Sequence, residues 1–145
     1  MSKKGVSHIF IDADVILDLL CQREPHVEQA VKLFTRIENE ELRGYTSPVI
    51  MANLFYLLRK QYSRTQATQF MQKLCLLLSI VPVNQRIIQQ ALTSNFTDIE
   101  DAIQYYAAKE SDIPILVTRN TKDYRNAKQV RVYSPTEFLA LYTEE

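Results

Sequence analysis

Along this chain, short runs of apolar residues alternate with longer stretches in which apolar residues recur among polar ones at helical spacing. Residues 8–12 and 115–118 form the most apolar short runs, which are typical of buried strands. Shorter strands are expected at 45–47, 79–83 and 130–133. Between them, residues 24–42 repeat apolar side chains at helical spacing, and Gly44 is expected to end that helix.

Helix-start signals divide the rest of the chain. Ser47 followed by Pro48, Ser63, Asn84 and Ser134 followed by Pro135 are good N-terminal caps. The further helices expected are 15–23, 49–60, 65–78, 85–94, 97–111 and 135–141. Strands separated by helices, without an Asn-Gly hairpin signal, predict an α/β fold with a mostly parallel sheet flanked by helices.

Composition narrows the class of protein. A length of 145 residues, with only 2 Gly and no linker-like segment, predicts one domain over residues 1–145. Equal numbers of basic and acidic residues, 17 each, exclude a protein that coats nucleic acid or membranes by bulk charge. The apolar stretch 74–83 is too short to span a membrane. Cys21 and Cys75 lack CxxC spacing and are expected to be buried thiols in a cytoplasmic protein.

Several acidic and amide side chains are expected at one edge of the sheet. In a parallel sheet, strands end and the following helices begin at the same edge, where such folds bind ligands. The candidates are Asp12, Asp14, Asn53, Asp98, Asp101, Asn120 and Asp123. Asp12 is the most informative, because a carboxylate that closes an apolar strand loses hydration unless a partner pairs with it. Asp98 has a structural alternative as a helix cap, and Asp123 as a turn residue.

Carboxylates brought together at this edge need protons or a cation. Two carboxylates about 4 Å apart repel by roughly 4 kcal/mol at an effective dielectric of about 20. A divalent metal ion removes that repulsion, and all-oxygen ligands favour Mg²⁺ or Mn²⁺. No His and Cys pair suggests zinc, since His8 is expected in a strand and His26 at a helix entry.

The order of these motifs resembles the PIN-domain (PilT N-terminus) family of metal-dependent ribonucleases, which includes many bacterial toxin nucleases. The matching segments cover nearly the whole chain: IFIDADVILDLL, TSPVIMANLFYLL, DIEDAIQYYAA, ILVTRNTKDY and VYSPTEFLAL. The resemblance implies a three-layer α/β/α sandwich with a parallel sheet of about five strands. It also implies hydrolysis of RNA phosphodiester bonds with Mg²⁺ or Mn²⁺, a homodimer and a small antitoxin partner.

Site residues carry over from the family by position. Asp12 matches the first metal-binding acid and Asp101 the third, and Asn120 and Asp123 fall in the last motif. Asn53 stands where the family usually has Glu, and an amide supplies neither a negative charge nor a general base. Two further acids are expected to support the ligands. These are Asp14, where the family often has Asn, and Asp98.

The resulting hypothesis is that Asp12, Asp101 and Asp123 hold one or two metal ions that acidify a bound water and stabilise charge on the phosphate. Thr118 and Asn120 would position ligands or water by hydrogen bonding. The cations beside the site are predicted to bind RNA phosphates, with a solvated loop as the structural alternative. They are Arg119, Lys122, Arg125, Lys128 and Arg131.

Two other functions fit parts of this sequence. IDADVILD looks like the nucleophile motif of haloacid-dehalogenase-like phosphatases, but those enzymes place their final acidic pair after the Thr motif. Here the acids at 98–101 precede Thr118, so the order argues against this class. The second alternative stays open. Asn53 could leave a catalytically weakened or inactive PIN domain that acts as an RNA-binding or regulatory module.

Overall fold

Five parallel strands form the central sheet of the computed structural model, which describes residues 6–125 and 127–142. Along the sheet their order is β3-β2-β1-β4-β5, so β1 lies in the middle. The strands are β1 (Ser7–Ile11), β2 (Leu42–Thr46), β3 (Leu78–Ile80), β4 (Ile115–Val117) and β5 (Arg131–Tyr133). All four strand pairs are parallel, which confirms the predicted sheet.

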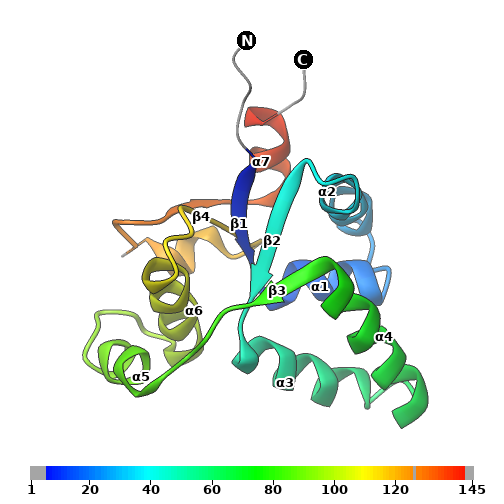
Figure 1. Cartoon of the computed structure of the whole chain (residues 1–145), viewed down its shortest axis with the longest axis horizontal. Coiled ribbons are helices and arrows are strands. Elements are labelled where there is room, and N and C mark those ends of the chain that lie inside the picture. The colour runs from blue at the N-terminus through cyan, green and yellow to red at the C-terminus, as the bar shows by residue number, and fades with distance from the viewer. Residues whose placement is uncertain (1–5, 126, 143–145) are drawn as a thin grey trace.

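Helices cover both faces of this sheet and give three layers (Figure 1). Within the described residues the helices are α1 (Ala13–Leu20), α2 (Val27–Glu38), α3 (Pro48–Leu58), α4 (Arg64–Leu77), α5 (Gln85–Leu92), α6 (Ile99–Glu110), α7 (Pro135–Leu141) and the 3₁₀ turn η1 (Thr121–Tyr124). The pair α5 and α6 lies on one side, and α1 and α2 lie on the other (Figure 1). The α/β/α sandwich expected from the sequence is confirmed.

The core is centred on β1 and β4, where Ile9, Phe10, Ile11, Leu116 and Val117 are fully buried. A strand buried on both faces explains why these segments are continuous apolar runs without alternation. The expected caps of the surrounding helices are also confirmed. The side chains of Ser47, Ser63, Asn84 and Ser134 each accept a hydrogen bond from the first turn of the helix that follows.

Gly44 was wrongly expected to end the second helix. The helix α2 ends at Glu38, the chain turns at Glu40 with φ of 64°, and Gly44 lies inside β2. A Cβ on Gly44 would lie 2.5 Å from Leu78 Cδ2 and 2.8 Å from Ile37 Cδ1. A side chain at position 44 would therefore displace the Leu78 and Ile37 methyl groups that pack against β2.

The expectation of buried thiols was also wrong. Cys75 is exposed and Cys21 half-buried, and both are free. The Leu-rich stretch around Cys75 misled the prediction, because α4 buries only a narrow face with Ala67 and Leu74 and leaves Leu76 87% exposed. Among the described residues, no helix is both long and apolar enough to cross a bilayer.

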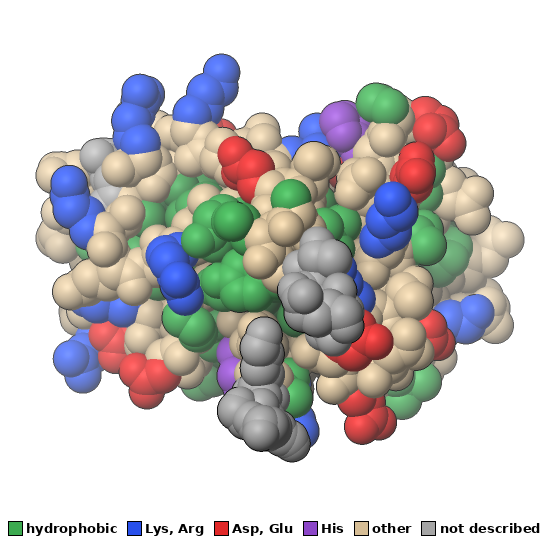
Figure 2. Space-filling model, turned by 90° about the horizontal axis from the view of Figure 1, so that it is seen from above, with side chains coloured by type: hydrophobic (Ala, Val, Ile, Leu, Met, Phe, Trp, Pro, Cys, Tyr) green, Lys and Arg blue, Asp and Glu red, His purple; other side chains and the backbone are tan. Residues whose placement is uncertain are grey.

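In Figure 1 the strand β1 runs downward from the N-terminus, so the carboxyl edge of the sheet faces down. Figure 2 looks from above and therefore shows the face at the amino edge of the sheet. On that face basic, acidic and hydrophobic side chains are interspersed. The cluster of acidic side chains predicted from the sequence is therefore expected at the opposite, carboxyl edge of the sheet.

Candidate active site

The carboxyl edge of the sheet assembles side chains from three separate segments. Asp12 follows β1 and caps α1, Asp14 lies in the first turn of α1, and Asp101 lies in the first turn of α6. Thr118 directly follows β4. The parallel register that aligns Ile11 with Val117 explains why Asp12 and Thr118 are neighbours.

Asp12 is the buried centre of this site, with an exposed fraction of only 9%. Its Oδ1 accepts a hydrogen bond from the Ala13 backbone N–H at 2.8 Å. Its Oδ2 accepts from Thr118 Oγ1 at 3.0 Å and lies 3.0 Å from the Tyr124 hydroxyl. Burial, and secondarily the charge of Asp14, raise the pKa of Asp12 to about 6.

The Tyr124 hydroxyl lies between Asp12 and Asp101. It is 3.0 Å from Asp12 Oδ2 and 3.3 Å from Asp101 Oδ1, and the side chain is 2% exposed. Burial, followed by the charges of Asp12 and Asp98, raises the pKa of Asp101 to about 7. A hydroxyl has one proton to donate, so it satisfies one carboxylate fully and leaves the pair short of one proton or a cation.

Asp14 is held by the loop that follows β4. Its Oδ2 accepts from the Arg119 backbone N–H at 3.0 Å and from Asn120 Nδ2 at 3.2 Å, and it lies 3.4 Å from Thr118 Oγ1, whose proton goes to Asp12. Its Oδ1 is buried and has no hydrogen-bond partner among the described residues. Burial raises the pKa of Asp14, because its carboxylate loses hydration, and the charge of Asp14 in turn raises the pKa of Asp12.

The other predicted site residues lie around this centre. Asp98 caps α6 by accepting from the Asp101 backbone N–H at 3.0 Å, which is the capping role that the sequence offered as an alternative to a role in the site. Asn53 on α3 donates from Nδ2 to Glu100 Oε1 at 3.2 Å, so its amide is engaged with an exposed carboxylate. Asp123 is exposed on η1, and its charge makes the smallest contribution to the raised pKa of Asp101.

The expected set of three metal-binding acids is not assembled. In the part of the chain that the structure describes, no three His, Cys, Asp or Glu side chains are placed to hold a metal ion. Asp12 and Asp101 converge on one hydroxyl, whereas η1 leaves Asp123 at the exposed rim. The remaining donors still fit Mg²⁺ or Mn²⁺, because such ions bind through one or two carboxylates, waters and substrate phosphates. The unpartnered Asp14 Oδ1 adds an oxygen acceptor to this set.

Arg119 was predicted to contact nucleic acid, and its guanidinium is engaged with Asp18. Arg119 Nε and Nη2 donate to the two Asp18 carboxylate oxygens at 2.7 and 3.2 Å, and Arg23 Nε donates to the same carboxylate at 3.0 Å. Asp18 is 1% exposed. By contrast, Lys122 on η1 and Arg125 directly after it are exposed, and they precede and follow Asp123 and Tyr124 in the chain.

Two functional side chains were missed from the sequence. Tyr124 follows the predicted site residue Asp123, but nothing in TKDY shows that the 3₁₀ turn points the tyrosine inward. Asp18 carried a clearer signal. A single acid in the apolar run VILDLL must either face solvent or pair with a cation, and the structure shows the second case.

The raised pKa values predict how stability depends on pH when divalent ions are absent. Asp12 and Asp101 have pKa values of about 6 and about 7 in the folded chain, against about 3.9 in an unfolded chain. Their protonated forms therefore favour folding. This contribution is complete below about pH 4 and is lost as pH rises through about 6 to 7.

We therefore expect wild type to lose stability between about pH 4 and 7 relative to an Asp12→Asn/Asp101→Asn double variant. Thermal unfolding in EDTA across this range measures the difference in midpoint between the two proteins. Because every other titrating group is shared, the difference isolates the two carboxyl groups. A difference that stays constant with pH would show that neither group is perturbed.

Comparison with known proteins finds a matching family, a relative similar in sequence and solved structures similar in fold. Residues 8–122 match the protein family described as PIN domain. The chain is 22% identical over 135 residues to Ribonuclease VapC1 of Aquifex aeolicus (strain VF5), covering 90% of this chain and 92% of that protein. A toxin-antitoxin complex from Klebsiella pneumoniae has a similar fold, with a TM-score of 0.66, 19% identity and coverage of 88% and 97%. The sarcin-ricin loop cleaving toxin VapC20 of Mycobacterium tuberculosis is also similar, with a TM-score of 0.61, 15% identity and coverage of 74% and 86%.

Proposed function

We propose, since this chain belongs to the PIN-domain family, that it is a Mg²⁺- or Mn²⁺-dependent endoribonuclease. The substrate would be single-stranded or structured RNA, cut by hydrolysis of phosphodiester bonds. The observation that carries the proposal is the pairing of Asp12 with Asp101 across the Tyr124 hydroxyl. Two carboxyl groups with raised pKa values at the carboxyl edge of a parallel sheet are typical of a site built for a cation.

In this mechanism Asp12 and Asp101 would hold the metal ion, and Asp14, Asn120 and Asp123 would surround it. A bound divalent ion would acidify a water molecule and stabilise negative charge on the scissile phosphate. Thr118 keeps Asp12 oriented through its hydroxyl.

Substrate binding would depend on cations close to these acids. Lys122 and Arg125 are exposed on and just after η1, and they would contact phosphates that flank the scissile bond. Such contacts give binding that weakens as salt concentration rises. The division into an acidic centre and a basic rim reconciles a net charge of zero with a polyanionic substrate.

The relatives support the biological setting of the proposal. One is named a ribonuclease, one is described as a toxin that cleaves the sarcin-ricin loop, and one as a toxin-antitoxin complex. We therefore propose that this chain is the toxin of such a pair, with an antitoxin protein as partner. As part of the same proposal, residues 1–145 form one domain that acts in the cytoplasm as a homodimer.

An RNA-binding or regulatory module without turnover is the alternative. The observation that favours it is Asn53, whose amide donates to Glu100 and supplies no charge to the Asp12 and Asp101 pair. RNA cleavage separates the two functions. The purified chain should cleave labelled single-stranded or structured RNA with Mg²⁺ or Mn²⁺ and should not cleave it in EDTA. Binding of RNA without cleavage under any of these metal conditions would establish the alternative.

Tyr124→Phe tests the geometry on which the proposal depends. Removing the hydroxyl leaves Asp12 and Asp101 without their shared partner, while the buried ring keeps its packing against Phe96. Loss of hydrogen bonds to metal ligands typically lowers metal affinity by about 10–100-fold, and we expect an effect in this range. Calorimetric titration with Mn²⁺ measures the dissociation constant directly, without any need for cleavage.

Tyr105→Phe is the matched control for this variant. Tyr105 is similarly buried, and its hydroxyl accepts from the Gln129 backbone N–H at 3.3 Å instead of bonding Asp12 or Asp101. Its loss should leave Mn²⁺ affinity at the wild-type value. Equal affinities for wild type and Tyr124→Phe would show that the hydroxyl does not organise the ion site.

A further inference from the structure

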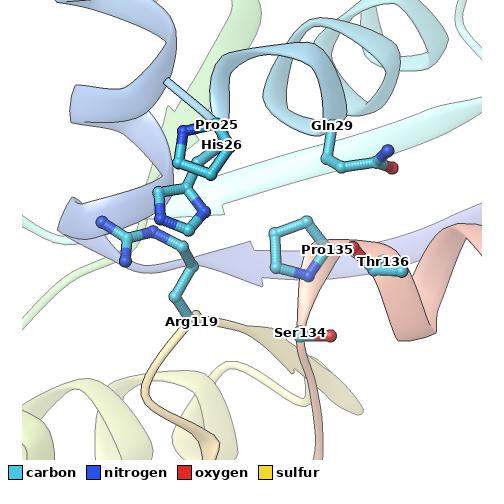
Figure 3. A pocket seen from close by; sticks show the side chains of 7 residues that line it. All are labelled: Pro25, His26, Gln29, Arg119, Ser134, Pro135 and Thr136. Carbon is cyan, nitrogen blue, oxygen red and sulfur yellow. The ribbon is translucent and has the colours of Figure 1, made fainter. Parts of the chain in front are cut away.

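A cavity of about 440 Å³ lies beside the acidic site, where α2 and α7 begin (Figure 3). The start of α2 contributes Pro25, His26 and Gln29, the start of α7 contributes Pro135 and Thr136, and Arg119 forms one end. Its volume is within the range of about 300–1,000 Å³ that is usual for small-ligand sites. The cavity is separate from the Asp12 and Asp101 pair, and no part of the proposed reaction uses it.

The loop after β4 joins this cavity to the acidic site. Thr118 donates to Asp12, and the next residue, Arg119, lines the cavity. Successive Cα atoms are about 3.8 Å apart, and successive side chains at the end of a strand point to opposite sides. A chain-like ligand that crosses this edge of the sheet can therefore touch both places with neighbouring units.

The Arg119 guanidinium is fixed in place by a buried acid. Nε and Nη2 donate to Asp18, which is 1% exposed, while the Arg119 side chain stays 29% exposed. An arginine has five N–H donors, and these bonds use only two of them. Arg23 also donates to Asp18, so two guanidinium groups share one carboxylate.

The rest of the lining suits a nucleotide. The His26 ring lies next to the Arg119 side chain, and Gln29 and Thr136 add polar groups (Figure 3). Pro25 and Pro135 supply rigid apolar surface against which a sugar or base can pack (Figure 3). Every described side chain that lines the cavity is neutral or basic, in contrast to the acids on the other side of Thr118.

We propose that this cavity binds a nucleotide of the RNA substrate next to the scissile bond, with its phosphate held by Arg119 and His26. The inference rests on the proposed function for the identity of the ligand, since a nuclease must hold the strand on both sides of the bond it cuts. Arg119 thus contacts RNA from the cavity, with Asp18 as the residue that orients it.

Binding and cleavage of RNA, measured separately, test this proposal. A His26→Ala/Gln29→Ala double variant removes two lining side chains and leaves the Arg119 and Asp18 contacts intact. His26 makes no side-chain capping bond in α2, so the helix should persist. We expect the dissociation constant for a short fluorescent single-stranded RNA, measured in EDTA, to rise about tenfold, as for loss of a hydrogen bond to a charged group.

His8→Ala is the matched control, because His8 lies at the amino end of β1 and its ring bonds the Tyr45 hydroxyl. It should bind RNA as wild type does. Wild-type RNA affinity in the double variant would overturn the cavity proposal, even if metal-dependent cleavage persists. Weaker RNA binding in a chain that never cleaves would support the cavity and overturn the nuclease. If the double variant no longer binds an antitoxin peptide but keeps its RNA affinity, the cavity proposal is overturned in favour of a protein ligand.

Discussion

Asp12→Asn and Asp101→Asn should each lower metal-dependent RNA cleavage by more than about 100-fold. Both carboxylates converge on the Tyr124 hydroxyl, so each would provide half of the charge that holds the ion. Loss of the hydrogen-bond partners of metal ligands already costs about 10–100-fold, and loss of a ligand charge should cost more. The measurement is the initial rate of cleavage of a labelled RNA at saturating Mn²⁺, with Mn²⁺ affinity from calorimetry beside it.

The matched control is Glu110→Gln, at the opposite end of α6 from Asp101 and exposed to solvent. It removes the same kind of charge from the same helix and should leave the rate unchanged. Both site variants should remain folded, since each removes a charge that burial disfavours. Metal-dependent cleavage that survives both substitutions would show that the activity belongs to a contaminant and that the site is assigned wrongly.

The placement of these two acids is a consequence of topology more than of local sequence. Asp12 ends the central strand, and Asp101 begins the helix that leads into the neighbouring strand β4. Both positions follow from the alternation of strands and helices, because parallel strands share one carboxyl edge. For the same reason the fold, and the edge of the sheet at which these acids lie, could be predicted from the sequence. The helix caps could be predicted from local sequence signals such as Ser47 followed by Pro48.

The features that could not be predicted depend on the orientation of individual side chains in the folded chain. The segment TKDY forms a 3₁₀ turn that buries Tyr124 and exposes Asp123, whereas the family motif suggests that Asp123 faces the site as a metal ligand. Similarly, Arg119 reads as one of five cations in a loop, yet its guanidinium pairs with an acid that lies 101 positions earlier in the chain. Long-range pairs of this kind leave no periodic signal in the sequence.

Gly44 shows the same limit in the core. A glycine after a helical pattern is a common helix stop, so the sequence favoured that interpretation. In the structure Gly44 lets Ile37 of the preceding helix α2 and Leu78 of the distant strand β3 approach β2 together. Local rules identify which residues are unusual, whereas tertiary packing decides what they do.

Asp18→Asn should destabilise the protein more than any other single substitution considered for the site. Asp18 is buried and accepts from both Arg119 and Arg23, so the amide removes the charge that both guanidinium groups face. Loss of one partner of a buried ion pair typically costs about 3–5 kcal/mol. We expect about 3 kcal/mol, because Arg119 and Arg23 are partly exposed and can regain water. At this chain length that corresponds to a fall of about 6–12 °C in the midpoint of thermal unfolding.

Glu28→Gln is the matched control for this stability measurement. Glu28 also pairs with a cation, Lys32, at 3.5 Å, but their side chains are 72% and 56% exposed. Exposed pairs contribute little because water and salt screen them, so the midpoint should not change measurably. The Asp18→Asn substitution should also affect function, since Asp18 orients the guanidinium of Arg119, the residue after Thr118. If Asp18→Asn unfolds at the wild-type temperature, the buried ion pairs do not fix the β4 loop, and the geometry inferred for both the acidic site and the neighbouring cavity loses its support.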